Sequence, residues 1–189
     1  MIRFAKPSDG REAIELVMIV LRDMELDIFN KLSEEHVIDL LVEAFETEPD
    51  YRYGYNNALI KEINGEVAGV AFGYPDHWED SIDEPFLKLL EKNGLSRDHR
   101  LFTEAEVFEG EWYLDTLVTS QKFRGQGVAT ELLEALPTQA KKHKRTKLGL
   151  NCDQGNDGAR KVYINNGLEK VGEIDIANHR YDHLQKDVI

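Results

Sequence analysis

The sequence predicts a single α/β domain in which helices flank a central sheet. Its length of 189 residues suits one domain, and a composition of 41% hydrophobic and 31% charged residues is that of an ordinary globular protein. Segments with apolar residues at helical spacing are interspersed with segments rich in β-branched and aromatic residues. In the latter, apolar and polar residues alternate, as in a β-strand. The pair Asn64-Gly65 lies between two of the latter and is typical of a tight hairpin turn. These three observations together favour a mixture of packed helices and strands.

Two helices are predicted to follow a short first strand. The strand comprises Ile2 to Phe4, and Pro7-Ser8-Asp9 then ends it and offers a helix cap. The first helix carries an apolar stripe at spacings of three and four, formed by Ala13, Ile14, Val17, Leu21 and Met24. The second helix begins at Ser33, with two acidic residues at its positive end. Its buried face is formed by Val37, Leu40, Leu41, Ala44 and Phe45.

A β-hairpin is predicted next, because Asn64-Gly65 supplies the positive φ angles of a type I′ turn between strands at 55–63 and 66–74. Residues 75–109 then break the strand pattern. They hold an acidic loop at 79–84, a short helix at 85–92, and three further acidic residues, Glu104, Glu106 and Glu109. We interpret this segment as an insertion within one domain that spans residues 1–189.

The second half of the chain alternates strands with helices. Strands are predicted at 111–119, 147–152, 169–176 and near 180–186, and helices at 128–136 and 159–165. Pro137 is expected to kink or end the first of these helices, because proline lacks the N–H group that a helix interior uses.

The charge and the cysteine content exclude several classes of function. Lysine and arginine number 23 against 36 aspartates and glutamates, and the resulting net charge of −13 repels nucleic acid and anionic lipid. The same charge also fits an acidic surface that only keeps the chain in solution. The single cysteine, Cys152, excludes an internal disulfide and a cysteine-based zinc cluster, and it fits a reducing compartment.

A cytoplasmic location is expected. The longest apolar run, from Leu16 to Leu21, is far shorter than the roughly 18–20 residues needed to cross a bilayer. The first residues lack the apolar stretch after a basic one that marks a secretory signal. We therefore expect no partnership with a membrane and none with nucleic acid.

The stretch that indicates chemistry runs from Phe123 to Thr130, with the sequence Phe-Arg-Gly-Gln-Gly-Val-Ala-Thr, between a predicted strand and a predicted helix. Glycines let a ligand approach the backbone, and the first N–H groups of a helix point outward at the positive end of its dipole. Such a turn binds phosphate or pyrophosphate. The dinucleotide fingerprint fits poorly because it needs a third glycine where Thr130 stands, and the nucleotide-hydrolase loop needs a Gly-Lys-Ser/Thr sequence that is absent. An ordinary tight turn is the alternative for Gly125 and Gly127.

This stretch resembles the core motif of the GNAT acyltransferase superfamily, Arg/Gln-x-x-Gly-x-Gly/Ala, which Arg124, Gly127 and Ala129 meet. A downstream segment is similar to that family's Asn-x-x-Ala-x-x-x-Tyr-x-x-x-Gly-Phe, with leucine in place of the final phenylalanine, through Asn156, Ala159, Tyr163 and Gly167-Leu168. The resemblance implies a mixed, mostly antiparallel central sheet of about six to seven strands flanked by helices. Family members usually have a short turn where this chain has residues 75–109, so the chain departs from the pattern there.

The resemblance also implies acetyl-CoA as the donor of an acetyl group that moves directly to an amine of a small molecule or peptide. Backbone amides would hold the pyrophosphate, and they belong to Arg124, Gly125, Gln126, Gly127, Val128, Ala129 and Thr130. The pantetheine arm would pair like an added strand along Leu117, Val118 and Thr119, with Asn156 and Ala159 on its other side. No metal is implied, and a homodimer is compatible with the pattern. The alternative is a non-catalytic acyl-CoA-binding or sensor domain of the same fold.

Acetyl transfer to an amine needs a proton acceptor, because an alkylamine with a pKa of ~10.4 is almost fully protonated at pH 7. Glu111 and Asp115 share one face of the predicted strand with Tyr113 and Leu117, and this face is expected to run toward the cofactor. Glu111 is interpreted as the base or a relay, with an exposed strand-end acid as the alternative, and Asp115 is the second candidate. The resemblance places Tyr163 beside the thioester sulfur, where its hydroxyl donates to the departing thiolate, and an aromatic core residue is the alternative.

Three other patterns carry less weight. His179, Tyr181 and His183 share one face of the last strand, a spacing that permits a metal site, but no further ligand is evident and no metal is predicted. The basic run at 141–147 follows a helix and is interpreted as a solvated helix end. The acids at 79–84 and 104–111 would attract a cationic acceptor if residues 75–109 fold over the acceptor entrance, and a remote solvated loop is the alternative.

Overall fold

A seven-stranded sheet forms the centre of the molecule in the computed structural model, which describes residues 1–188. The strands lie in the order β1-β2-β3-β4-β5-β7-β6. Every neighbouring pair is antiparallel except β4 and β5, so the mixed, mostly antiparallel sheet expected from the sequence is confirmed. The strands are β1 (Ile2–Phe4), β2 (Ala58–Ile63), β3 (Glu66–Pro75), β4 (Glu111–Thr119), β5 (Lys147–Asp153), β6 (Glu169–Ile176) and β7 (His179–Asp187).

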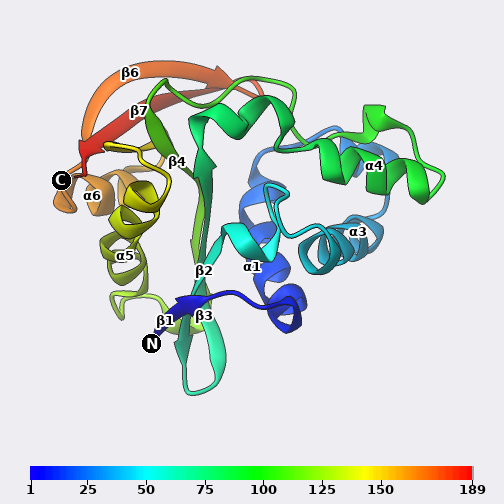
Figure 1. Ribbon diagram of the computed structural model, residues 1–189, viewed down its shortest axis with the longest axis horizontal. Coiled ribbons are helices and arrows are strands. Elements are labelled where there is room, and N and C mark those ends of the chain that lie inside the picture. The colour runs from blue at the N-terminus through cyan, green and yellow to red at the C-terminus, as the bar shows by residue number, and fades with distance from the viewer. Residues whose placement is uncertain (189) are drawn as a thin grey trace.

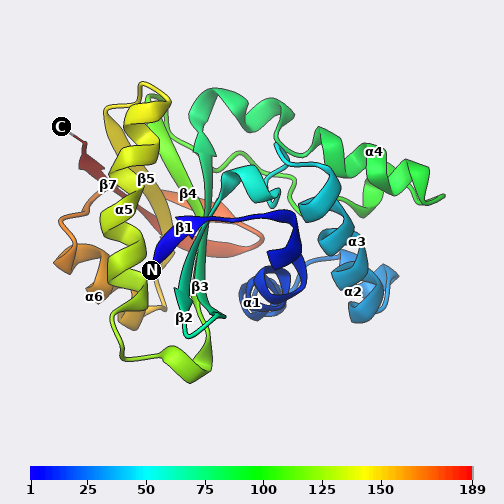
Figure 2. The same cartoon turned by 60° about the horizontal axis from the view of Figure 1, so that its bottom comes forward.

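Helices lie on both sides of this sheet (Figure 1). The views in Figures 1 and 2 agree that α1, α3 and α4 are on one side and α5 and α6 on the other. The first group forms one core with β2 and β3, and α5 forms a second core with the opposite face. The helices are α1 (Gly10–Asp23), α2 (Ile28–Lys31), α3 (Glu34–Thr47), α4 (Glu84–Lys92), α5 (Val128–Lys142) and α6 (Asp157–Asn165).

The local signals read from the sequence place the first elements correctly. The hydroxyl of Ser33 accepts a hydrogen bond from the backbone N–H of His36 at 3.2 Å and so caps α3. Asn64 and Gly65 have φ angles of 52° and 81°, as a type I′ turn requires. The strand before this turn begins at Ala58, three residues later than expected, because residues 55–57 form a 3₁₀ turn.

Residues 76–110 connect β3 to β4 and are folded rather than open. They contain a 3₁₀ helix (Asp76–Ser81), α4 and a second 3₁₀ helix (Arg97–His99). The apolar face of α4 is buried against α3 and the chain that follows it, and the ring of Phe86 stacks on Tyr51 with centroids 5.2 Å apart. This packing holds α4 on the α1 side of the sheet (Figure 1).

Two irregularities in β4 shape the middle of the molecule. Phe72 pairs with Thr116 and Gly73 with Leu114, so Asp115 is the extra residue of a β-bulge. On its other edge β4 pairs with β5 only as far as Leu114 and Leu150. Beyond that point the remaining residues of β4 have backbone groups that β5 does not bind.

The break expected at Pro137 is wrong, because α5 continues to Lys142. The residues just beyond the proline, Gln139 and Ala140, are buried on the same face as Leu133 and Leu136. Burial of this face against the sheet outweighs the hydrogen bond that proline cannot make, since tertiary packing contributes more to helix stability in proteins than local propensity does.

Pro137→Ala is expected to raise the free energy of unfolding by about 2 kcal/mol. Alanine is favoured over proline by ~3 kcal/mol inside a helix, and the more flexible unfolded chain offsets about 0.4–1 kcal/mol of this. Urea denaturation measures the difference, and Thr138→Ala, at the exposed neighbouring position of α5, is the control. A Pro137→Ala protein no more stable than wild type contradicts this account of the helix.

Candidate functional site

A cleft with a volume of about 690 Å³ opens where β4 and β5 stop pairing. Its walls come from residues 115–119 of β4 and 151–153 of β5, together with α1 and α6. These two helices lie on opposite sides of β4 in Figures 1 and 2, so the cleft passes between the strands from one side of the sheet to the other. The divergence of the two strands therefore creates the cleft.

The structure brings most of the site residues named from the sequence to this cleft. Those that line it are Asp115, Leu117, Val118, Thr119, Arg124, Asn156, Ala159 and Tyr163. Those that do not line it are Glu111, Gly125, Gln126, Gly127, Val128, Ala129 and Thr130. Apart from Arg124, those that line the cleft come from β4 on one wall and from α6 and its N-cap on the other. Of those that do not line it, residues 125–130 follow Arg124 directly in the chain.

The glycine-rich turn has the backbone shape that its sequence suggests. Gly125 and Gly127 have φ angles of 74° and 79°, a conformation that residues with a side chain rarely adopt. Gly127 is the residue before α5, and positions 124–127 are exposed. Val128 instead is buried against β3 beside Gly69, where an added Cβ would lie 2.5 Å from its side chain. The turn thus presents free backbone N–H groups to solvent at one end of the cleft.

The opposite wall is organised by α6. The side chain of Asn156 accepts a hydrogen bond from the N–H of Ala159 at 3.1 Å and caps the helix. Tyr163 lies one turn beyond Ala159 on the same face, so both reach the cleft. Burial raises the pKa of Tyr163, with a smaller contribution from the nearby Cys152, so its hydroxyl keeps its proton at neutral pH.

Glu111 is not placed as the sequence suggested. Its side chain is 0% exposed and lies inside the sheet, away from the cleft. The carboxylate accepts hydrogen bonds from the N–H of Phe108 at 2.8 Å, from Nε2 of His183 at 2.8 Å and from the amide of Gln185 at 2.7 Å. Gly149 on β5 makes room for it, since a Cβ there would lie 1.7 Å from the carboxylate. Burial and three donors hold the carboxylate away from the cleft, so the alternative of an exposed strand-end acid is wrong, while the role of Glu111 as base or relay stays a prediction.

His183 is hydrogen-bonded through both ring nitrogens in this buried group. The amide nitrogen of Asn151 must face the carbonyl of Glu106, which only accepts, at 2.9 Å. The amide oxygen of Asn151 therefore faces Nδ1 of His183, at 2.6 Å, while Nε2 faces Glu111. Both ring nitrogens are thus hydrogen-bonded, and Phe108 stacks on the ring with centroids 3.7 Å apart. The side chain is hydrogen-bonded on every polar edge and is not a metal ligand in this arrangement.

The same network continues to the cleft. Asn151 donates to the hydroxyl of Tyr113 at 3.2 Å, and Tyr113 donates to Oε2 of Glu106 at 3.1 Å. Asn151, Tyr113 and Glu106 all line the cleft. Glu111 is therefore joined to the cleft wall by a chain of hydrogen bonds, as the predicted role of a relay would require.

Arg52 lies at the centre of the acidic wall and is 2% exposed. Two of its nitrogens bind Asp83 in a fork with both distances at 2.9 Å. The third, Nη1, donates to Asp115 at 2.5 Å and to Glu106 at 3.2 Å. One guanidinium thus faces three carboxylates, and two of these line the cleft.

Glu106 is the functional candidate that the sequence did not single out. It is 3% exposed, and burial, followed by the neighbouring Asp115 among the raising causes, moves its pKa up from 4.5 to about 7 despite the opposing charge of Arg52. The sequence shows it only as one of three acids in an acidic segment. Its position depends on how residues 76–110 fold back onto β4, which no local pattern reveals.

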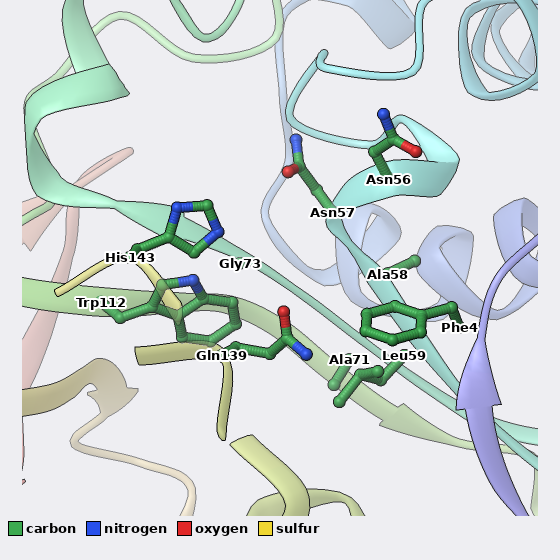
Figure 3. A pocket seen from close by; sticks show the side chains of 10 residues that line it. All are labelled: Phe4, Asn56, Asn57, Ala58, Leu59, Ala71, Gly73, Trp112, Gln139 and His143. Carbon is green, nitrogen blue, oxygen red and sulfur yellow. The ribbon is translucent and has the colours of Figure 1, made fainter. Parts of the chain in front are cut away.

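A second cavity, shown in Figure 3, is too small for a substrate. It lies between β2, β3 and the C-terminal part of α5, and its volume of about 10 Å³ holds at most a single water molecule. Gly73 is required beside it, because a Cβ there would lie 2.2 Å from the ring of Trp112. Within residues 1–188 no three histidine, cysteine or acidic side chains gather as metal ligands, and no helix is long and apolar enough to cross a membrane.

The comparisons with known proteins agree with one another. The family model described as "Acetyltransferase (GNAT) family" matches residues 21–167. A solved acetyltransferase is 48% identical over 100% of both chains with a TM-score of 0.91. An N-acetyltransferase from Staphylococcus aureus Mu50 is 30% identical, with a TM-score of 0.86, and the match covers 98% of this chain and 100% of that one. No curated protein matches the chain.

More distant structures share the fold. The PaiA N-acetyltransferase from Thermoplasma acidophilum, solved in complex with coenzyme A, is 12% identical with a TM-score of 0.55, and the match covers 99% of this chain and 98% of that one. At this identity the likeness is one of fold alone.

Glu111→Gln is expected to lower the free energy of unfolding by about 3–5 kcal/mol. The backbone N–H of Phe108 and the amide of Gln185 donate to the carboxylate, so the amide of glutamine would turn its NH₂ group toward a donor and break the buried contact with His183. Urea denaturation measures the loss. Glu109→Gln, two residues away and exposed, removes the same charge and should change stability by less than about 0.5 kcal/mol. Equal effects of the two substitutions would refute the buried pairing.

Proposed function

Because this chain belongs to the GNAT family of acetyltransferases, we propose that it transfers an acetyl group from acetyl-CoA to an amine of a small molecule or peptide. The observation that carries the proposal is the cleft between β4 and β5, which has the glycine-rich turn at one end and Tyr163 on its wall. The direct test is release of free thiol when the protein is given acetyl-CoA and a panel of amines. Thiol release that depends on the amine supports transfer.

Acetyl-CoA, the acetyl donor, would bind along the edge of β4 that β5 leaves unpaired. Residues 117–119 line the cleft beyond the last pairing with β5, so their backbone groups are available to the amide groups of a pantetheine arm. The pyrophosphate would lie on the exposed turn from Arg124 to Thr130, where two glycines with positive φ turn backbone N–H groups toward solvent and α5 adds the positive end of its dipole. Asn156 and Ala159 would face the arm from α6.

The chemistry needs a proton acceptor for the amine and stabilisation of the leaving thiolate. Asp115 is the sequence candidate that lines the cleft, and it lies at the bulge of β4 two residues before the proposed pantetheine edge. A backbone N–H of residues 115–117 would polarise the acetyl carbonyl. The hydroxyl of Tyr163 keeps its proton and would donate to the sulfur as the C–S bond breaks.

A non-catalytic acyl-CoA-binding domain of the same fold is the alternative. It requires the cofactor end of the cleft but makes no use of acids at the other end. The presence of Glu106, Asp115 and Tyr163 on the walls of one cleft favours the enzyme. Acetyl-CoA binding without thiol release for any amine would favour the binding domain.

Gly127→Val is expected to weaken acetyl-CoA binding at least tenfold, because the side chain is strained at a φ of 79° and would intrude where the pyrophosphate is proposed to lie. Titration calorimetry measures the affinity. Gly65→Val is the matched control: its φ is 81°, no atom lies within 4 Å of its added Cβ, and it lies in the β2–β3 turn. Equal affinities in the two folded variants would contradict the assignment of the loop.

Tyr163→Phe is expected to lower kcat by about tenfold to a hundredfold with little change in acetyl-CoA affinity. General acid assistance contributes about 10²–10⁴-fold, and a thiolate leaves tolerably well without it, which places the effect at or below the low end. Steady-state thiol release gives kcat, with Tyr55→Phe, outside the cleft lining, as the control. Wild-type turnover in the Tyr163→Phe protein would reduce Tyr163 to a packing role.

A further inference from the structure

The end of the cleft away from Arg124 is acidic and apolar. Along residues 1–188, Arg124 is the one lysine or arginine in the lining, whereas four acidic residues contribute to it. The acids are Asp23, Glu106, Asp115 and Asp153. His179 is the one histidine there, and it lies 3.4 Å from Asp153, which leaves no cation to receive a carboxylate of a substrate. Apolar and aromatic side chains complete this end, among them Ile19, Met24, Tyr53, Phe102 and Tyr181.

Glu106 and Asp115 are held differently by their neighbours. Asp115 has both oxygens engaged, one by Arg52 at 2.5 Å and the other by the hydroxyl of Thr116 at 2.8 Å. Glu106 uses Oε2 for Arg52 and Tyr113, at the longer distances of 3.2 and 3.1 Å. Within residues 1–188 its second oxygen, Oε1, accepts no hydrogen bond, although the residue is 3% exposed and lines the cleft. Each carboxylate has two donors, but those of Glu106 are farther away and leave one oxygen free, so its ionised form is stabilised less and it is the better proton acceptor.

We propose, on the basis of the function proposed above, that the acceptor enters this end of the cleft as the ammonium ion of a primary alkylamine without a neighbouring carboxylate, and that Glu106 removes its proton. Asp115 is the second carboxylate of the subsite and stays hydrogen-bonded to Arg52. The base is therefore supplied by the segment that joins β3 to β4, and not by Glu111 of β4.

The proton balance of this step closes. The ammonium nitrogen gives one proton to Oε1 of Glu106, and the neutral nitrogen attacks the thioester carbonyl to form the C–N bond. When the C–S bond breaks, the hydroxyl of Tyr163 gives its proton to the sulfur. The second proton of the nitrogen passes through solvent in the cleft to the Tyr163 oxygen and restores its hydroxyl. Glu106 then releases its proton to solvent. The amide product carries no charge at this nitrogen, so its attraction to the two carboxylates falls and it leaves.

Several charged or titratable groups face Glu106 and set the pH at which it acts. They are Arg52 and Asp83, Tyr74 of β3, Glu79 of the first 3₁₀ helix of the connecting segment, Tyr113 and Asp115 of β4, and Tyr181 of β7. The pKa of Glu106, raised to about 7, makes it half ionised near neutrality. Because the ionised form is the base, kcat/KM should rise with pH through about 7, while the amine remains an ammonium until about pH 10.

The test compares Glu106→Gln with Glu104→Gln and Glu109→Gln, which remove equal charge from exposed positions of the same segment. Thiol release with 2-phenylethylamine and with pentane-1,5-diamine gives kcat/KM from pH 5.5 to 9. Wild type and both controls should show the rise near pH 7, and Glu106→Gln should lose it together with about 10²-fold or more of the rate. Glu106→Asp keeps a carboxylate and should restore a rise with pH. A Glu106→Gln protein with the pH profile and rate of the controls would overturn the assignment.

The acceptor class is tested with pairs that differ by one carboxylate: 2-phenylethylamine against phenylalanine, and pentane-1,5-diamine against lysine. Each amine should exceed its carboxylated partner at least tenfold in kcat/KM, and the reverse order would overturn the acceptor class. Titration of the protein with acetyl-CoA distinguishes a failure of the proposed function from a failure of the role of Glu106. A wild-type protein that neither binds acetyl-CoA nor releases thiol contradicts the proposed function, whereas binding and transfer that are indifferent to Glu106 contradict only the role of this residue.

Discussion

The buried guanidinium of Arg52 is the interaction on which the acceptor end of the molecule depends. Removing a charge of this kind from water costs several kcal/mol unless hydrogen-bonded counter-charges surround it. Its carboxylate partners are Asp83 and Glu106, from the segment between β3 and β4, and Asp115 from β4. The ring of Phe102 lies 4.4 Å from the same guanidinium. Because Arg52 must be satisfied, this segment has to lie against the sheet, and the cleft acquires its acidic wall.

A chain of hydrogen bonds connects Arg52 to residues on the far side of β4. Glu106, Tyr113, Asn151 and His183 link it to Glu111, at the beginning of the only parallel strand pair along residues 1–188. The pair separates just after this network ends, so the cleft begins at a rigidly connected region. The other end of the cleft is an exposed turn with glycines at positive φ. One end is therefore fixed by buried polar contacts, and the other leaves backbone groups free for a ligand.

The sequence predicts those features that depend on local backbone chemistry. The Asn64-Gly65 turn, the Ser33 cap and the glycine-rich stretch before α5 each follow from the conformations that a few adjacent residues allow. The positions of Glu111, Glu106 and Pro137 do not, because each depends on residues far away in the chain. Period two puts Glu111 and Asp115 on one face, but the bulge at Asp115 and the space left by Gly149 send their side chains to different surroundings. Glu106 is held at the cleft by contacts with residues far away in the chain, among them Arg52, 54 residues before it, and Asn151, which donates to its carbonyl.

The acidic cluster has a cost that the proposed function explains. Three carboxylates around one guanidinium leave a surplus of negative charge in a poorly solvated place, and burial, together with the neighbouring Asp115, raises the pKa of Glu106. The folded state of such an acid binds its proton more tightly than the unfolded state, so this residue's contribution to stability falls as the pH rises from about 4.5 to about 7. An ammonium acceptor would cancel part of the surplus when it enters and would restore it when the neutral amide forms. A cluster that weakens the free protein near neutrality is thus suited to binding a cation and releasing an uncharged product.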